Sequence, residues 1–170
     1  KTIGDLVNSM PEGLSEDEKY FKVSVVALGA DSLIGTMTES LVYLLKINNG
    51  KLLSEINWPD DPPMTGVPVI ERYAAKDLKF NNITIQKNQR IRLYLDAAGY
   101  ISNEQASYAQ LYFGGGNHLC PGISLGREIW KTIINFLKSM DVKILIQEGS
   151  RRQFDNVFNI YNTIKVIIDD

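Results

Sequence analysis

Residues 113–122 decide the fold that this sequence predicts, and they have the sequence Phe-Gly-Gly-Gly-Asn-His-Leu-Cys-Pro-Gly. Three consecutive glycines allow tight turns and a close approach of the backbone to a flat partner. An apolar stripe at helical spacing follows, so the loop would deliver the sulfur of Cys120 to the start of a helix. A thiolate in that position is stabilised by the helix dipole and by free backbone N–H groups.

Cys120 and His118 are the only cysteine and the only histidine of the chain. A single cysteine excludes an internal disulfide and fits a reducing, cytoplasmic location. One cysteine and one histidine cannot build a zinc site of the finger type. If the chain binds a metal through a soft ligand, Cys120 must be that ligand and the metal must bring most of its other ligands. The alternative is that Cys120 is a buried, inert thiol, the common fate of a lone cysteine.

The composition is that of an ordinary globular protein, and we expect one domain over residues 1–170. The formal net charge is −2, without the basic face that a nucleic-acid partner requires. The sequence has no uninterrupted apolar run of membrane-spanning length, so we expect no membrane partner. Its first residues lack the basic-then-apolar layout of a signal peptide.

A long helix is predicted from about Glu16 to Ile47. Ser15 and Glu18 form a capping-box sequence at its start, and residues 48–50, Asn-Asn-Gly, provide a stop signal. Gly29 and Gly35 lie inside this helix, and each costs about 1 kcal/mol relative to alanine. We therefore expect another part of the structure close to the helix backbone at these glycines.

The rest of the chain predicts a mostly helical α+β fold with small sheets. The prolines of residues 58–68 exclude regular helix there, and residues 96–112 have no clear period and are expected to form a loop. The other expected elements are a short helical piece within 1–14, a helical turn or two at 51–56, strands within 78–85 and 90–95, a helix over 125–140, and strands at 142–146 and 164–168.

The glycine-rich segment resembles the haem-binding loop of bacterial cytochrome P-450 enzymes, F-G-x-G-x-H-x-C-x-G-x-x-L-(A/G)-R. Every fixed position matches, through Leu125, Gly126 and Arg127. The resemblance implies haem b (iron protoporphyrin IX), bound with Cys120 as the axial ligand of the iron and His118 against a haem propionate. It also implies cofactor-binding positions at Phe113, Gly114, Gly116 and Gly122.

Two further segments agree with this resemblance. Residues 27–32, Ala-Leu-Gly-Ala-Asp-Ser, are similar to the distal-helix motif (A/G)-G-x-(D/E)-T, with Ser32 in place of Thr. The resemblance implies that Gly29 leaves room for oxygen and that Asp31 and Ser32 relay protons; the alternative is a solvated Asp and a Ser that the helix tolerates. Residues 71–77 resemble the R-x-A-x-x-D entry to a small sheet, which implies that Arg72 pairs with a propionate. The alternative is an ordinary surface arginine.

The sequence also departs from the family pattern. The best candidate for the E-x-x-R motif is Glu55-Ile56-Asn57-Trp58, where Trp58 stands in place of Arg. The resemblance covers nearly the whole chain but only the C-terminal half of a family member, so we expect a single truncated haem domain. Residues 158–168 fit the last hairpin of the family.

Three functions follow from the resemblance: a truncated P-450-type monooxygenase acting on a small organic or natural-product substrate, a haem carrier or non-oxidative haem catalyst, and a haem-free interaction subunit. A ferredoxin-type protein is the expected electron donor of the enzyme, and Arg127 and Lys131 could meet an acidic donor or form a solvated face. A homodimer or a partner subunit is expected to cover the long helix. The candidates for that surface are Val23, Val26, Ile34 and Leu41, although core positions are the alternative.

Overall fold

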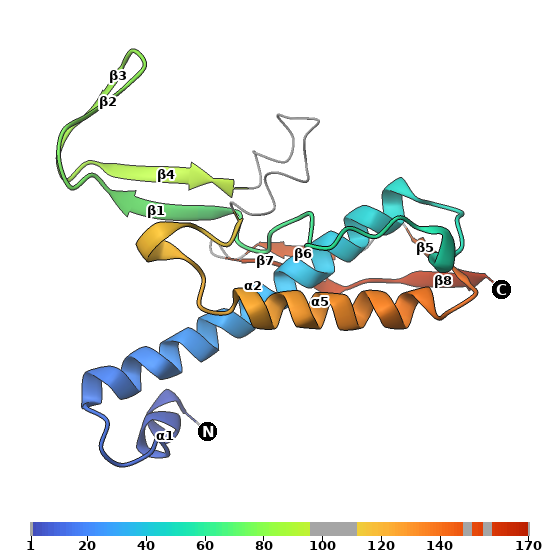
Figure 1. Ribbon diagram of the computed structural model, residues 1–170, viewed down its shortest axis with the longest axis horizontal. Helices are drawn as coiled ribbons and strands as arrows, with labels where there is room; N and C mark the ends of the chain where they lie inside the picture. The colour runs from blue at the N-terminus through green and yellow to red at the C-terminus, as the bar shows by residue number, and fades with distance from the viewer. Residues whose placement is uncertain (1, 96–111, 148–150, 155–157, 170) are drawn as a thin grey trace.

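The long helix α2, Glu16–Ile47, runs diagonally through the molecule (Figure 1). Its N-cap is Ser15, whose N–H donates to Glu18 Oε2 at 2.8 Å while Glu18 N–H donates to Ser15 Oγ at 3.3 Å. At the other end the Asn48 N–H donates to Leu44 O at 3.1 Å. Local capping interactions therefore set both ends of α2, and the predicted bounds are confirmed.

The computed structural model describes residues 2–95, 112–147, 151–154 and 158–169. Most of the loop expected over residues 96–112 therefore lies outside the described residues. The remaining helices are α1 (Ile3–Asn8) and α5 (Ile123–Lys138), with the short 3-10 helices η1 (Leu53–Glu55) and η2 (Gly116–His118). The strands are β1 (Val69–Tyr73), β2 (Leu78–Phe80), β3 (Ile83–Ile85), β4 (Arg90–Tyr94), β5 (Lys143–Ile146), β6 (Arg151–Phe154), β7 (Asn159–Thr163) and β8 (Val166–Asp169).

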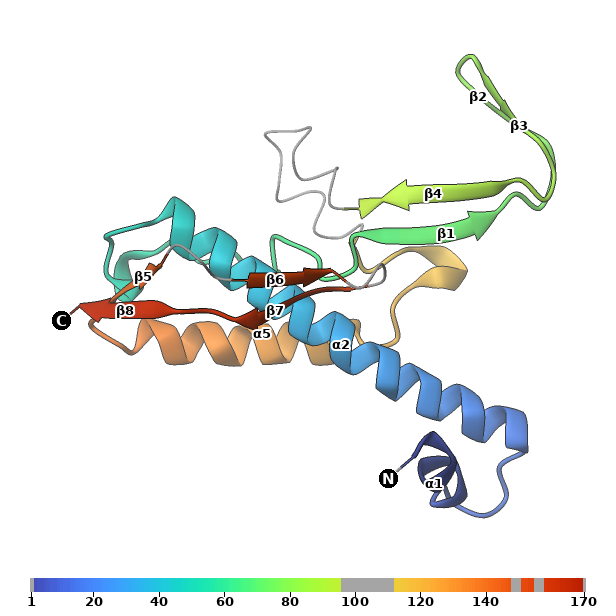
Figure 2. The same ribbon diagram turned by 180° about the vertical axis from the view of Figure 1, so that it is seen from behind.

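The described strands form four separate antiparallel pairs, β1–β4, β2–β3, β5–β8 and β6–β7. The hairpin β2–β3 lies between β1 and β4 in sequence and projects away from the helices (Figures 1 and 2). Asn81, in its turn, has a φ of 50°, as predicted for a turn-forming asparagine. The closing strands β5 and β8 are also confirmed. The hairpin expected over residues 158–168 is wrong, because β7 pairs with β6 and β8 pairs with β5.

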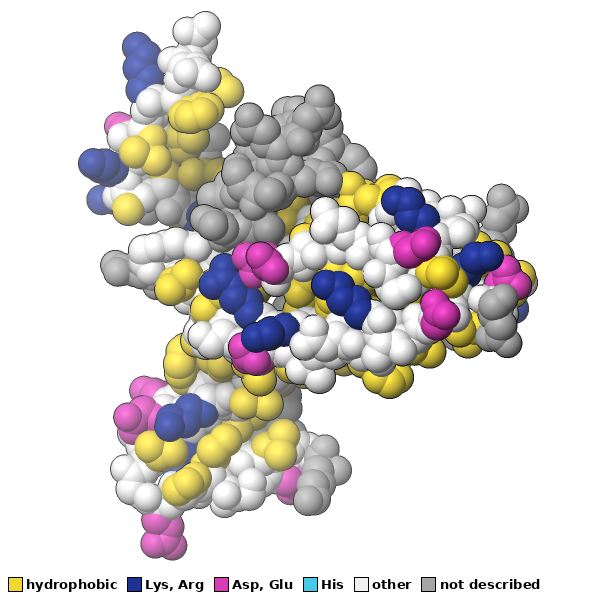
Figure 3. All heavy atoms as spheres, turned by 45° about the vertical axis from the view of Figure 1, so that its right-hand side comes forward, with side chains coloured by type: hydrophobic (Ala, Val, Ile, Leu, Met, Phe, Trp, Pro, Cys, Tyr) yellow, Lys and Arg dark blue, Asp and Glu magenta, His cyan; other side chains and the backbone are white. Residues whose placement is uncertain are grey.

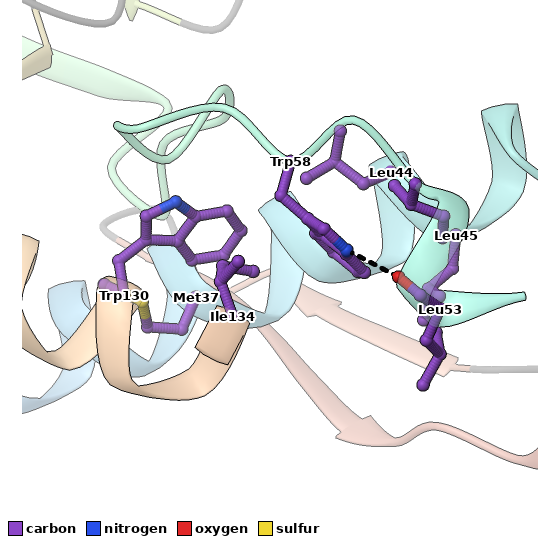
Figure 4. Close-up of a cluster of buried hydrophobic side chains, with 8 residues drawn as sticks. Met37, Leu44, Leu45, Leu53, Trp58, Trp130 and Ile134 are labelled. Carbon is purple, nitrogen blue, oxygen red and sulfur yellow. Dashed lines mark hydrogen bonds between the residues drawn. The ribbon is translucent and has the colours of Figure 1, made fainter. Parts of the chain in front are cut away.

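The core joins the C-terminal half of α2 to α5 and η1 (Figure 4). Trp130 is completely buried, and Trp58 is 6% exposed and donates its Nε1–H to Leu53 O at 2.9 Å. Burying a tryptophan removes a large apolar surface from water, and the indole N–H needs a partner inside. The buried cluster comprises Met37, Leu44, Leu45, Leu53, Ile56, Trp58, Trp130 and Ile134.

Two glycines allow the irregular connection before β1 to cross α2. A Cβ on Gly35 would lie 2.5 Å from Asn159 O and 3.0 Å from the Cα of Gly66. Gly66 N–H donates to Thr36 Oγ1 at 2.9 Å, and Asn159 N–H donates to Gly66 O at 2.7 Å. The close neighbour expected at Gly35 is therefore present. At Gly29 a Cβ would have no atom of the described residues within 4 Å, so the expectation fails there.

The N-terminal half of α2 has little cover, apart from α1, beside which Val23 is 3% exposed. Val26 and Ile34 are 69% and 50% exposed, as expected for an interaction surface. Val23 is instead buried, which confirms the alternative of a core position there, and Leu41 is only partly exposed. Figure 3 shows hydrophobic side chains gathered on the lower part of the molecule, where α1 and the start of α2 lie.

Within the described part of the chain, α2 is the one helix long and apolar enough to cross a membrane. Core helices of soluble proteins pass the same test of length and composition. In this chain the buried residues of α2 lie mostly in its C-terminal half, which includes Met37, Leu44 and Leu45 of the core cluster. The sequence predicts no helix of this kind because charged residues such as Asp31 and Glu39 interrupt its apolar runs, and by length and composition that prediction is wrong for α2.

Candidate functional site

The loop that carries Cys120 is closed by a backbone hydrogen bond: Cys120 N–H donates to Phe113 O at 2.7 Å. Inside it, η2 is held by the His118 N–H, which donates to Gly115 O at 3.1 Å. Each bond links residues within one short segment, so the loop folds through local interactions. The structure therefore brings together Phe113, His118 and Cys120, as the sequence predicts.

Two glycines of the loop adopt conformations that other residues rarely adopt. Gly114 has a φ of 71° and Gly116 a φ of 56°. A Cβ on Gly114 would also overlap the carbonyl oxygen of His118. Gly115, in contrast, is extended, and a Cβ there would meet nothing within 4 Å among the described residues. At Gly114 any side chain would both strain the backbone and collide with a neighbouring atom. At Gly116 a side chain would strain the backbone alone.

Cys120 stands directly before the first turn of α5. Ile123 N–H donates to Cys120 O at 3.3 Å. Gly126 N–H donates to the carbonyl oxygen of the N-cap residue Gly122 at 2.8 Å. A Cβ on Gly122 would lie 3.7 Å from Cys120 Sγ, so glycine keeps space beside the sulfur. The half-buried sulfur therefore belongs to the segment directly before the N-terminus of α5, the position that the sequence predicts for it.

The donor set at this loop is suited to a metal that brings its own ligands. No group of three or more His, Cys, Asp and Glu side chains that could hold an ion occurs among the described residues. Cys120 supplies one soft sulfur, and the exposed glycines 114–116 present backbone without side chains. These features fit a planar cofactor such as haem, in which the macrocycle supplies the other ligands of the iron.

Residues 27–32 of α2, which resemble the distal-helix motif, precede Leu33, a residue that lies near the cysteine loop. A Cβ on Gly126 would lie 3.7 Å from Phe113 Cε1 and 3.8 Å from Leu33 Cδ1, so α2 and α5 approach each other here. Ser32, which precedes Leu33, is half-buried and donates its hydroxyl to Gly29 O at 3.0 Å. Asp31 is exposed. The fold thus brings Leu33, the residue after Ser32, and Phe113 of the loop to the same position on α5.

Arg72 lies on β1, where it is exposed and donates from Nη1 to Glu71 O at 2.7 Å. The Glu71 side chain binds Arg90 and Arg92 on β4, and the hydrogen bond from Arg90 lowers the pKa of Glu71. Among the described residues no hydrogen bond or ion pair joins Arg72 to the cysteine loop. The propionate role of Arg72 therefore stays a prediction.

Among the described residues, Trp58, which stands at the position of the Arg in the E-x-x-R motif, makes no polar contact that would take the place of the Glu–Arg ion pair. It is buried in the core, whereas Glu55, at the end of η1, is exposed. Trp130 donates its Nε1–H to Pro59 O at 2.9 Å, which ties the connection after Trp58 to α5. Apolar packing and indole hydrogen bonds therefore hold this connection against α5.

The sequence did not reveal a second link to α5, between Arg127 and Asp61. Arg127 Nε lies 2.7 Å from Asp61 Oδ1, and Nη2 lies 3.0 Å from Oδ2. The hydrogen bonds that Arg127 donates to the Asp61 carboxylate raise the pKa of Arg127. No local pattern marks this pair, because the two residues are 66 positions apart. The guanidinium expected to face an acidic donor is thus engaged by this chain's own carboxylate, while Lys131 is exposed.

Neither the protein-family models nor the curated proteins contain a match to this sequence. The structure, in contrast, resembles solved cytochromes P-450. CYP164A2 of Mycobacterium smegmatis has 17% sequence identity and a TM-score of 0.69. P450BioI, solved with an acyl carrier protein carrying hexadec-9Z-enoic acid, has 20% identity and a TM-score of 0.68. The LnmA hydroxylase of the leinamycin pathway of Streptomyces atroolivaceus has 17% identity and a TM-score of 0.66.

Each of these matches includes 96% of this chain but only 46% to 49% of the solved structure. The chain therefore spans about half the length of the solved structures that it matches. The long helix, the cysteine-loop helix and the small sheets are the elements that the sequence predicts for the C-terminal half of a P-450 fold. This chain has the fold of the C-terminal half of a cytochrome P-450.

Proposed function

We propose that this chain is a haem-thiolate protein with the oxidoreductase activity of a cytochrome P-450 monooxygenase. The observation that carries the proposal is the closed loop around Cys120, in which glycines required by the backbone present one half-buried sulfur at the start of α5. The P-450 fold of the chain supports the same function.

Each part of the site has a role in this proposal. Cys120 would hold the iron of haem b, which when bound supplies the redox chemistry of oxygen activation. His118 and Arg72 would donate hydrogen bonds to the propionates. The Ser32 hydroxyl, held on Gly29 O, would accept a hydrogen bond at its oxygen, and exposed Asp31 would relay protons between water and the site.

The substrate we propose is a small organic molecule, and the electron donor a ferredoxin-type protein. Two of the similar proteins indicate the range: one is described as a hydroxylase of a biosynthetic pathway, and the other was solved with a carrier-bound fatty acid. The single cysteine supports a reducing, cytoplasmic location for this chemistry.

A second candidate function is that of an interaction subunit, with or without haem. The observation that favours it is the exposed apolar side of α2, where Phe21 and Val26 are each 69% exposed. Exposed apolar patches on a folded protein often mark protein interfaces. We propose that a second copy of this chain or a partner subunit covers this side.

The test is an absorbance titration of the purified chain with haem, followed by reduction and addition of carbon monoxide. Thiolate ligation gives the strongly red-shifted Soret band that defines the P-450 class, and Cys120→Ser should abolish that band. Cys120→Ser is a matched control because it changes one atom of a half-buried side chain. A chain that takes up no haem would exclude the first function and leave the haem-free interaction subunit.

Oxygenase activity is separated from simple haem carriage by a second pair of variants. Asp31→Asn should slow turnover with peroxide or a surrogate electron donor without changing haem content, since Asp31 is exposed and the amide has nearly the same size. If Asp31→Asn loses haem and turnover in equal proportion, the residue has a structural role.

A further inference from the structure

The connection of residues 53–61 lies against α5, the helix that begins just after Cys120. Leu53 N–H donates to Val142 O at 2.9 Å, which fixes the start of the connection beside β5. Trp130 of α5 holds Pro59 O at 2.9 Å near its end. Two buried prolines, Pro62 and Pro63, follow Asp61 and restrict its backbone. Asp61 is therefore presented to α5 from a well-anchored segment.

Asp61 accepts hydrogen bonds from Arg127 at both carboxylate oxygens, from Nε at 2.7 Å and from Nη2 at 3.0 Å. A planar guanidinium matches this two-point contact, whereas a lysine ammonium would make a single contact. The side chain of Asp61 is 24% exposed and that of Arg127 is 43% exposed. The pair therefore lies at the edge of the molecule, and it fixes the plane of the guanidinium.

The guanidinium so fixed lies over the ring of Phe113, with its carbon 6.0 Å from the ring centroid. The ring also lies near α5 at Gly126, where a Cβ would lie 3.7 Å from Phe113 Cε1. Phe113 O, in turn, accepts the N–H of Cys120. A continuous series of contacts thus runs from Asp61 through Arg127 and Phe113 to the backbone of Cys120.

We propose that Asp61 is a positioning residue for Cys120, which acts by holding Arg127 against Phe113. When Asp61 releases Arg127, Phe113 loses a guanidinium held over its ring, and the loop that Phe113 closes opens more often. The sulfur of Cys120 is then exposed to solvent for a larger fraction of the time. This inference concerns the loop of the protein alone, and its consequence for the iron ligand rests on the proposed function.

The first test uses the single thiol of the 170-residue chain without haem. The rate of reaction of Cys120 with Ellman's disulfide reagent should rise about two- to fivefold in Asp61→Asn, the range expected for losing an exposed ion pair. Asp61→Glu, which keeps the carboxylate, should restore most of the slow rate. The matched control is Glu71→Gln, which removes a carboxylate that binds Arg90 at two points on β1 and β4.

Global stability separates a positioning role from a structural one. The urea midpoint of each variant is measured beside its thiol rate. A faster thiol reaction with an unchanged midpoint supports the inference. The inference is overturned if the rise in thiol reaction rate is fully accounted for by the loss of stability that the lower urea midpoint reports. Asp61 would then stabilise the whole fold. Equal thiol rates in Asp61→Asn, Glu71→Gln and the unchanged chain also overturn it.

Arg127→Lys provides the second variant, because it retains the charge but loses the two-point contact. It should give a thiol rate between those of the unchanged chain and Asp61→Asn. In a haem-loaded chain, Asp61→Asn should shift part of the reduced carbon monoxide complex from the thiolate-ligated to the thiol-ligated spectrum. Failure of the chain to take up haem would refute the proposed function alone, since the thiol rates are measured without haem.

Discussion

The N–H of Cys120 and the carbonyl oxygen of Phe113 lie 2.7 Å apart and close the loop that the two residues bound. This bond is possible because the backbone turns back on itself at Gly114 and Gly116, both at positive φ. The position of the sulfur at the start of α5 thus depends on glycine at two defined positions and on one backbone hydrogen bond.

Alanine substitutions at the three consecutive glycines should have graded effects on the loop. Gly116→Ala should weaken local stability by about 1 kcal/mol, from backbone strain alone. Gly114→Ala should cost more, by about 1–3 kcal/mol, because its Cβ would also overlap His118 O. Gly115→Ala, in extended backbone with open space, is the control. The thiol reaction rate of Cys120 measures the order, and an equal effect of all three would contradict the loop geometry.

The two glycines inside α2 should respond to alanine with opposite signs. Gly29→Ala should stabilise the haem-free chain by up to about 1 kcal/mol, because alanine is the better helix former and space is open there. Gly35→Ala should destabilise it by about 1–3 kcal/mol, since the new Cβ would collide with Asn159 O and Gly66. Urea denaturation measures both. The same sign for both variants would show that the crossing of Gly35 and Gly66 is misplaced.

The capping carboxylate of α2 should titrate below the usual range. Hydrogen bonds from the Ser15 N–H and hydroxyl lower the pKa of Glu18 from its ordinary value of 4.5. A lowered pKa in the folded state stabilises the cap above the unfolded value, and that contribution is lost as the pH falls through the folded value. NMR titration should therefore place the Glu18 midpoint below 4.5, and Ser15→Ala should move it back toward 4.5. Alanine keeps the N–H of residue 15, so an unchanged midpoint in Ser15→Ala would contradict only the hydrogen bond from the Ser15 hydroxyl.

The exposed side of α2 should drive association. Light scattering at micromolar concentration should find a dimer or larger species of the unchanged chain. Replacing Phe21 and Val26 with serine should reduce the association and leave the urea midpoint nearly unchanged, because both side chains are exposed. Val23→Ser is the contrasting variant and should destabilise the fold, since Val23 is 3% exposed. A monomer at this concentration would contradict the proposed interface.

Several features were predictable from sequence because they depend on neighbouring residues. The ends of α2 follow from Ser15, Glu18 and Asn48, which satisfy backbone groups of the same helix. The turn of the cysteine loop follows from glycines that tolerate positive φ. These interactions span a few residues, so the sequence pattern determines them.

The remaining features depend on residues that meet only when the chain has packed. Residues 158–168 form separate pairs with β5 and β6, although their sequence suits a hairpin equally well. Val23 and Val26 have the same residue type on one helix, yet one is buried and the other exposed. Burial depends on which element lies against each face, and a single helix pattern does not contain that information.

By itself, therefore, the sequence determined the long helix, the cysteine loop and the placement of Cys120 before α5, through caps and backbone conformations that act locally. Only the tertiary structure decided that Asp61 holds Arg127, that Gly66 crosses α2 at Gly35, and that Trp58 enters the core. These contacts join distant parts of the chain, and their geometry is set by the packing of all the elements together.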